Sequence, residues 1–199
     1  MEEAKLYPAY YMTFDKKYTG NRNKYGGLPT HLPPEYPTDE RFGQMTFLCQ
    51  IYCDEKMLKI PDTLCLQVYQ LFINGMEASD PIVVQVPLGA AENTDQIGLS
   101  CSYLPEGDIL FRETTDEITK ESIDQLIDTK GNHLTMPKLG GWSIDDERDQ
   151  SRFLGQIHDG DYETGPNGAV WNISPFNWGC GSILMMYLND EGKVEWNLW

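Results

Sequence analysis

The chain has 199 residues, with 15 Lys and Arg against 31 Asp and Glu, which gives a formal net charge of −16. This length is typical of one domain that buries a core without disulfides. The charge excludes nucleic acid as a direct ligand and excludes a polybasic membrane patch, because both would require positive surface. No apolar run approaches the ~20 residues that span a bilayer, and residues 1–5 lack the start of a signal peptide. We therefore expect a cytoplasmic protein.

The first part of the chain, residues 6–37, contains five prolines and many tyrosines. Its irregular pattern predicts an ordered loop whose aromatic side chains pack on a neighbouring surface. The next segment, Phe47 to Cys53, has the composition of a strand, and alternation would place Phe47, Cys49, Ile51 and Cys53 on one face.

The five cysteines have no CxxC spacing that would indicate a zinc site. We interpret them as small buried thiols in a reduced compartment, because free cysteine is among the most buried residue types. The alternative is a metal or redox pair at Cys49 and Cys53, which would need a further ligand from His31, His133 or His158.

Three more strands are predicted at 64–73, 81–88 and 108–112, with Pro87 indicating an edge or a strand end. Thr114 and Glu117 then fit a capping box, and the apolar residues that follow have helical spacing. This pattern predicts a helix near 115–128. The segments 182–188 and 193–199 flank a turn and predict a C-terminal hairpin.

A short set of landmarks occurs twice in the same order. Lys24-Tyr25-Gly26-Gly27 recurs as Lys138-Leu139-Gly140-Gly141, and residues 47–51 (FLCQI) recur as 153–157 (FLGQI), each followed by an apolar strand. We infer two related units about a pseudo-twofold axis. The predicted fold is α+β and mostly β, with two intertwined repeats sharing one core and few helices. The predicted organisation is a single domain, 1–199, with halves at 24–110 and 138–199 joined by the helix.

The repeated motifs leave two alternatives open. Gly26, Gly27, Gly140 and Gly141 are structural turns or phosphate-cradling loops, and the turn is favoured because no helix start follows Gly27. Two alternatives also remain for the side-chain amides of the repeated glutamines. Gln50 and Gln156 either brace loop backbone or line a ligand cleft between the halves, since a buried amide must be hydrogen-bonded.

These residues resemble the YwqG-like family of bacterial proteins, a domain of unknown function. The resemblance is carried by residues 26–29 (GGLP), by both FLxQI segments, by the second Gly-Gly pair and by residues 178–181 (WGCG) before the last apolar strand. It covers the chain from about residue 24 to 199. It implies a duplicated, mostly β fold, and it brings no established activity, catalytic residue or cofactor.

Two acidic segments follow the second half's motifs. His158, Asp159 and Asp161 could form a site at a strand end, although a solvated acidic turn is the commoner reading of such a pattern. Asp145, Asp146 and Glu147 form a second charged loop. No metal motif and no catalytic motif is present, so we predict neither metal nor cofactor.

The net charge favours a non-enzymatic binding protein, because a negative field steers basic partners. Immunity-type proteins that mask the cationic cleft of a toxin have this size and charge. We predict that Asp145, Asp146, Glu147, Asp161 and Glu163 contact such a partner. The alternative is a small-molecule-binding protein or enzyme with a cleft near Gln50, Gln156, His158, Asp159 and Trp178. A third hypothesis is a structural subunit that docks through its aromatic N-terminal segment.

Overall fold

The computed structural model describes residues 4–118, 136–143, 152–158, 163–164, 170–171, 175–176 and 182–199. The secondary-structure elements of these residues are β-strands, so the prediction of a mostly β fold is confirmed. Among the same residues, no helix has the length and apolar character that crossing a membrane would require.

The described strands form one large, mainly antiparallel sheet of 11 strands. Ten of them follow the order β17-β16-β13-β12-β1-β11-β2-β5-β6-β9, and β10 (Leu99–Ser100) pairs with β5 in parallel. Their bounds are β1 (Lys5–Asp15), β2 (Lys24–Tyr25), β5 (Thr46–Tyr52), β6 (Thr63–Gln70), β9 (Ile82–Pro87), β11 (Gly107–Ile118), β12 (Lys138–Gly140), β13 (Phe153–His158), β16 (Ile183–Leu188) and β17 (Val194–Leu198).

Three short hairpins lie outside this sheet. They pair β3 (Thr38–Asp39) with β4 (Gly43–Gln44), β7 (Phe72–Ile73) with β8 (Met76–Glu77), and β14 (Glu163–Thr164) with β15 (Val170–Trp171).

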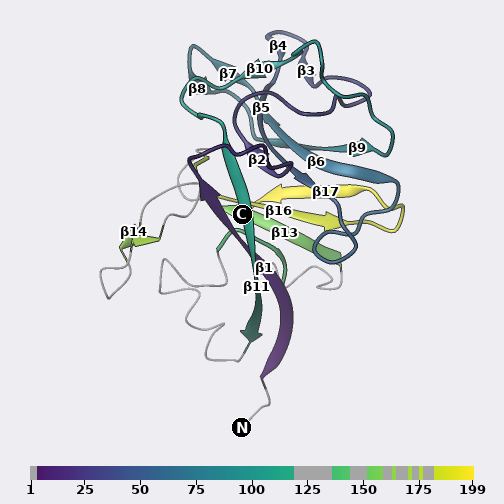
Figure 1. Ribbon diagram of the computed structural model, residues 1–199, viewed down its shortest axis with the longest axis vertical. Coiled ribbons are helices and arrows are strands. Elements are labelled where there is room, and N and C mark those ends of the chain that lie inside the picture. The colour runs from purple at the N-terminus through teal and green to yellow at the C-terminus, as the bar shows by residue number, and fades with distance from the viewer. Residues whose placement is uncertain are drawn as a thin grey trace.

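Two long strands, β1 and β11, lie at the centre of the order and pair from Lys5 opposite Ile118 to Asp15 opposite Asp108. In the strand order they separate the group that contains β5, β6 and β9 from the group that contains β13, β16 and β17, and Figure 1 shows them running along the length of the molecule. The prediction of a loop over 6–37 is therefore wrong at 6–15, which belong to β1. The tyrosines there have high strand propensity, and Pro8 obscured the pattern without preventing pairing along β1.

The predicted helix near 115–128 is also wrong at its start. Thr114 and Glu117, which fit a capping box, belong to β11, where they pair with Ala9 and Leu6 of β1. The strand predicted at 108–112 thus continues to Ile118, because the long partner β1 offers a backbone ladder that the local capping pattern cannot match. The remainder of the predicted helix lies outside the described residues.

The other predicted strands are confirmed. Residues 64–73 form most of β6 together with β7, and residues 81–88 contain β9, with Pro87 as its last residue at an end of the sheet order. The C-terminal hairpin is β16 and β17. Its turn is held by Asn189, whose Oδ1 accepts hydrogen bonds from the backbone N–H of Glu191 and Lys193 at 3.0 and 2.9 Å.

A β-bulge changes the predicted alternation in β5. The pairing with β6 shifts register between Phe47 and Cys49, so Phe47 packs with Tyr69 in one cluster, whereas Leu48 and Cys49 lie in the main core. The prediction that Phe47 shares a face with Cys49 is therefore wrong.

The two ends of the sheet order approach each other through one side chain. Gln85 of β9 donates from Nε2 to the backbone carbonyl of Gly192 at 3.1 Å and accepts at Oε1 from the N–H of Val194, in β17, at 2.7 Å. This amide takes the place of a backbone ladder between β9 and β17, and the sheet is nearly closed.

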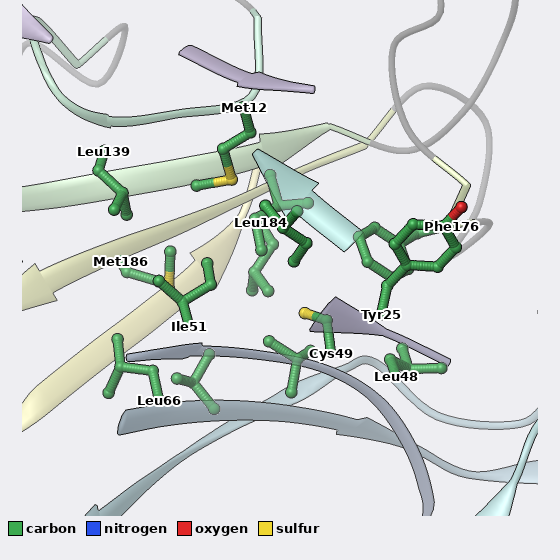
Figure 2. Packing of buried hydrophobic residues seen from close by; sticks show 14 of the residues in the cluster. Met12, Tyr25, Leu48, Cys49, Ile51, Leu66, Leu139, Phe176, Leu184 and Met186 are labelled. Carbon is green, nitrogen blue, oxygen red and sulfur yellow. The ribbon is translucent and has the colours of Figure 1, made fainter. Parts of the chain in front are cut away.

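The largest hydrophobic cluster draws on both groups of strands. Figure 2 shows Ile51, Cys49 and Leu66 facing Leu184 and Met186, and all of these residues are buried. The space between the two groups is therefore packed with hydrophobic side chains. Rings complete one end of the cluster, where Phe14, Tyr25 and Phe176 make edge-to-face contacts.

Candidate functional site

The first Lys-x-Gly-Gly motif begins on β2 and turns sharply after it. Lys24 pairs with Gln50 across the sheet, and Gly26 and Gly27 have φ values of 64° and 66°. The N–H of Gly26 donates to the carbonyl of Leu48 at 2.7 Å. A Cβ at Gly26 would lie 2.5 Å from the carbonyl oxygen of Leu104, so this turn requires glycine for both conformation and space.

The turn brings a carboxylate onto the lysine of the motif. Lys24 Nζ lies 2.5 Å from Glu106 Oε1, and the two side chains are 7% and 33% exposed. The same carboxylate lies against Gly27, where an added Cβ would come within 2.7 Å of it. The ring of Tyr18 packs 5.2 Å from Lys24 Nζ. The ion pair is thus shielded on the lysine side and partly open on the glutamate side.

The second Lys-x-Gly-Gly motif holds a carboxylate in a closed environment. Lys138 pairs with Gln156 in the sheet, and its Nζ lies 2.5 Å from Asp116 Oδ2, with both side chains fully buried. Asp116 also accepts from the N–H of Trp142 at 2.9 Å and from the hydroxyl of Tyr11 at 3.1 Å. Three donors therefore compensate this buried charge.

The buried carboxylate perturbs its neighbours. Burial lowers the pKa of Lys138, and the charge of Asp116 opposes that change. The pKa of Tyr11 is raised, first by burial and then by the negative charge of Asp116 and the hydrogen bond to it. Both shifts follow from removing water around the cluster.

The side chains of the repeated glutamines form hydrogen bonds with backbone groups of neighbouring loops. Gln50 is fully buried; its Oε1 accepts from the N–H of Thr30 at 2.9 Å, and its Nε2 donates to the carbonyl of Arg22 at 2.7 Å. Gln156 is fully buried as well and donates to the carbonyl of Met136 at 3.1 Å. Arg22 and Met136 each precede the lysine of a motif by two positions. These contacts match the loop-bracing alternative.

A cavity of about 500 Å³ lies beside the first motif. Lys24, Gly27 and Glu106 contribute to one side of its lining, and the loop that contains Glu92 contributes further residues. Its full lining is Lys24, Gly27, Leu28, Pro29, Thr30, Glu92, Asn93, Thr94, Gln96 and Glu106. The cavity therefore lies next to the partly exposed ion pair of Lys24 and Glu106.

A buried histidine, His31, comes directly after the cavity-lining residues Leu28 to Thr30. His31 Nδ1 lies 2.5 Å from the hydroxyl of Tyr52, and the guanidinium of Arg22 stacks over the Tyr52 ring at 4.3 Å from its centroid. Burial raises the pKa of Tyr52, which opposes its use as a base near neutral pH. This arrangement is a packed polar contact beneath the loop.

The cysteines of the described residues are free thiols. Burial raises the pKa of Cys53 to about 11 and that of Cys65 to about 12, which disfavours the reactive thiolate. Among the described residues, no group of three or more His, Cys, Asp or Glu side chains could hold a metal ion.

No family model matches the chain, and no curated protein matches it. The fold and the geometry above therefore carry the functional argument.

Several predicted site residues lie elsewhere or outside the described parts. His158 is the last residue of β13, pairs with Ile183 and is partly buried. Glu163 lies in β14, opposite Trp171 of β15. The positions that fall outside the described residues are Asp145, Asp146, Glu147, Asp159, Asp161 and Trp178.

The cleft predicted between the halves stays a prediction, because Asp159 and Trp178 lie outside the described residues, and the described cavity lies beside Gly27 and Glu106. Gln50 faces loop backbone, and the core clusters fill the space between the strand groups (Figure 2). Glu92, Glu106 and Lys24 are not among the site residues predicted from the sequence. The available signal was that lysine precedes both Gly-Gly pairs, since a buried lysine requires an acidic partner.

Proposed function

We propose that the protein is a non-enzymatic binding protein whose acidic surface takes a basic protein partner. The observation that carries this proposal is the excess of 31 acidic over 15 basic residues together with the way the basic ones are used. Across the described surface, exposed acidic side chains outnumber exposed basic ones.

Among the described residues, five of the 15 basic side chains form ion pairs within the chain. Lys24 and Lys138 are buried in ion pairs. Exposed or partly exposed pairs add Lys56 with Glu113, Arg152 with Asp190, and Lys193 with Glu191. The charge left to act on a partner is therefore negative, and such a field accelerates association with a cationic surface. The cationic cleft of a toxin, such as a nuclease, is the partner that fits this role best.

We further propose that the two halves are copies of one unit, in keeping with the resemblance to the YwqG-like family. Lys24 opposite Gln50 corresponds to Lys138 opposite Gln156, and both strands that carry the glutamine have a register shift one residue after the phenylalanine. The sheet order supports the same pairing of units, with β2, β5, β6 and β9 on one side of β1 and β11, and β12, β13, β16 and β17 on the other.

The test of the binding role is a native pull-down at low and then moderate salt, followed by kinetics with the purified retained protein. We expect a basic protein held near one-to-one and released by salt. Reversing Asp145, Asp146 and Glu147 to lysine should lower the association rate and flatten its salt dependence. The control reverses Glu77 and Asp80, which are exposed elsewhere. An unchanged association rate at low salt for the first variant would contradict electrostatic masking through these three residues.

A second candidate function is small-molecule binding, favoured by the cavity of about 500 Å³ beside Lys24 and Glu106. Its volume falls within the range of ligand sites. Screening of polar metabolites by thermal shift would test it. A ligand that raises the melting temperature, and loses this effect in Glu106→Gln, would favour this function over protein binding.

A further inference from the structure

Several donors around the cavity beside the first motif are engaged within the chain. Its lysine is engaged, because Lys24 Nζ is 2.5 Å from Glu106 Oε1. Asn93 Nδ2 donates to the carbonyls of Pro29 and Ile97 at 3.0 and 2.8 Å. The N–H of Thr30 donates to Gln50. Each of these groups therefore makes at least one hydrogen bond inside the chain.

Two carboxylates belong to the same lining. Glu106 is one-third exposed and meets Lys24 through Oε1, and Glu92 is exposed. Because Lys24 balances one of the two negative charges, the lining carries a net negative charge, in a protein whose total is −16. The cavity is lined by carboxylates, by donors that are already hydrogen-bonded within the chain and by apolar residues. Such a lining suits a long side chain that ends in a delocalised cation.

We propose that this cavity binds the side chain of an arginine on the basic partner, with its guanidinium between Glu92 and Glu106. The inference rests on the proposed function and names the group that is recognised. Guanidinium is preferred to ammonium, because its planar set of donors can engage two carboxylates at once, while its stem packs on Leu28 and Pro29.

An anionic ligand fits the same cavity less well. Glu106 already lies on Lys24 and against the bare backbone of Gly27, which is the place that a ligand carboxylate would take. In the second motif, the equivalent contact is made by the chain's own Asp116 with Lys138. The motif therefore supplies its own anion in both halves, and the remaining space favours a cation.

The test is an amide-resolved NMR titration of the full chain at low salt with N-acetyl-arginine amide. N-acetyl-citrulline amide is the matched probe, since it has nearly the same shape without the charge, and acetate is the anionic probe. We expect arginine to shift the amides of Gly27, Thr94 and Gln96 in a saturable manner. Citrulline amide and acetate should leave them nearly unchanged.

Two variants sharpen the test. Glu92→Gln removes one carboxylate without touching the Lys24 ion pair, and Glu106→Gln removes the other. We expect each to weaken arginine binding roughly three- to tenfold, the range of a partly exposed charge contact. Glu77→Gln is the control, because it makes the same change at an exposed site in β8 and should alter the affinity less than about twofold. Melting curves confirm that each variant is folded.

The outcomes separate this inference from the function on which it rests. No saturable shift, shifts confined to other surfaces, or equal affinity in Glu92→Gln and the parent would overturn the arginine site. A pull-down that still retains a basic protein would then leave the binding function standing. Larger shifts with acetate than with arginine would likewise overturn the inference, by showing that the cavity prefers anions.

Discussion

The two Lys-x-Gly-Gly motifs each pair their lysine with a carboxylate, but the two ion pairs lie in different environments. In both, a lysine beside a left-handed glycine turn meets a carboxylate at 2.5 Å. Asp116 is fully buried and has two further donors, whereas Glu106 is one-third exposed beside a cavity. The comparison teaches that the motif fixes a carboxylate close to its turn, and that the surroundings decide whether this carboxylate holds the fold or remains available to a ligand.

The largest expected effect comes from breaking the closed motif. Asp116→Ala leaves the buried Lys138 without its counter-charge and should lower the free energy of unfolding by about 3–5 kcal/mol. Glu106→Ala should cost less, about 1–2 kcal/mol, because water reaches that pair. Urea denaturation of both variants measures the difference. Equal costs would mean that the two environments do not differ energetically.

Replacing the buried pair as a unit sharpens the same point. Asp116→Leu combined with Lys138→Met should be more stable than either single variant, because no unpaired charge is left inside. A double-mutant cycle by urea denaturation gives the coupling between the two side chains. A double variant that is less stable than both single variants would show that the ion pair contributes more than mutual compensation.

The second glycine of each motif gives the next effect. A Cβ at Gly141 would come within 2.4 Å of Asp116 Oδ2 at a φ of +80°, inside a cluster with no room to yield. We expect Gly141→Ala to cost about 2–4 kcal/mol, combining steric overlap with left-handed strain. At Gly27 the obstacle is the side chain of Glu106, which can move toward the cavity, so Gly27→Ala should cost about 1–2 kcal/mol. Thermal unfolding of both variants tests this order, and the reverse order would contradict it.

High pH should distinguish the halves through their titrating groups. The pKa of Cys53 is raised by burial from 9.0 to about 11, and that of Cys65 to about 12, so the unfolded chain loses these protons first. Stability from these thiols is complete below pH ~9 and is lost as the pH rises toward their folded values. The lowered pKa of Lys138 acts in the opposite direction, since the unfolded lysine retains its proton longer.

Urea denaturation between pH 8 and 11 measures this dependence. We expect the parent to lose stability over this range and Cys65→Ala to lose less. A parallel decline in both proteins would assign the alkaline loss to other groups, such as the buried tyrosines. Working under reducing conditions keeps thiol oxidation out of the comparison.

The smallest effect concerns the amide that joins the two ends of the sheet. Gln85→Leu removes the hydrogen bonds to the carbonyl of Gly192 and the N–H of Val194. These two backbone groups, at the seam between β9 and β17, must then form hydrogen bonds with water. We expect a loss of about 0.5–1.5 kcal/mol and, relative to the parent protein, a larger increase of amide hydrogen exchange in β17 than in β16. Unchanged exchange of the Val194 amide would show that Gln85 does not hold the seam.

Much of the sheet was accessible from sequence because its signals are local. The β9 segment and the C-terminal hairpin show short apolar runs bounded by proline, glycine or asparagine, and the structure confirms them. The errors occurred where pairing partners are distant. Thr114 to Glu117 satisfies a helix-capping pattern, yet β1, more than 100 residues earlier, supplies the ladder that makes it a strand.

The candidate site was less predictable for the same reason. Gln50 and the Gly-Gly turns were identified, and the recurrence of lysine before both turns was visible in the sequence. The carboxylates were not identifiable, because Glu106 lies 82 residues from Lys24 and Asp116 lies 22 residues from Lys138. Spacing in sequence carries no information about such pairs.

The sequence by itself determined a mostly β chain, the places of its hairpin and edge strand, and two glycine turns of one type, because periodicity and turn chemistry act over a few residues. It also determined the acidic character that underlies the proposed binding role. Only the tertiary structure decided that residues 5–15 form a central strand, which carboxylate meets each lysine, and that one ion pair is sealed while the other borders a cavity. Those outcomes depend on burial and long-range pairing, which arise only when distant segments share one core.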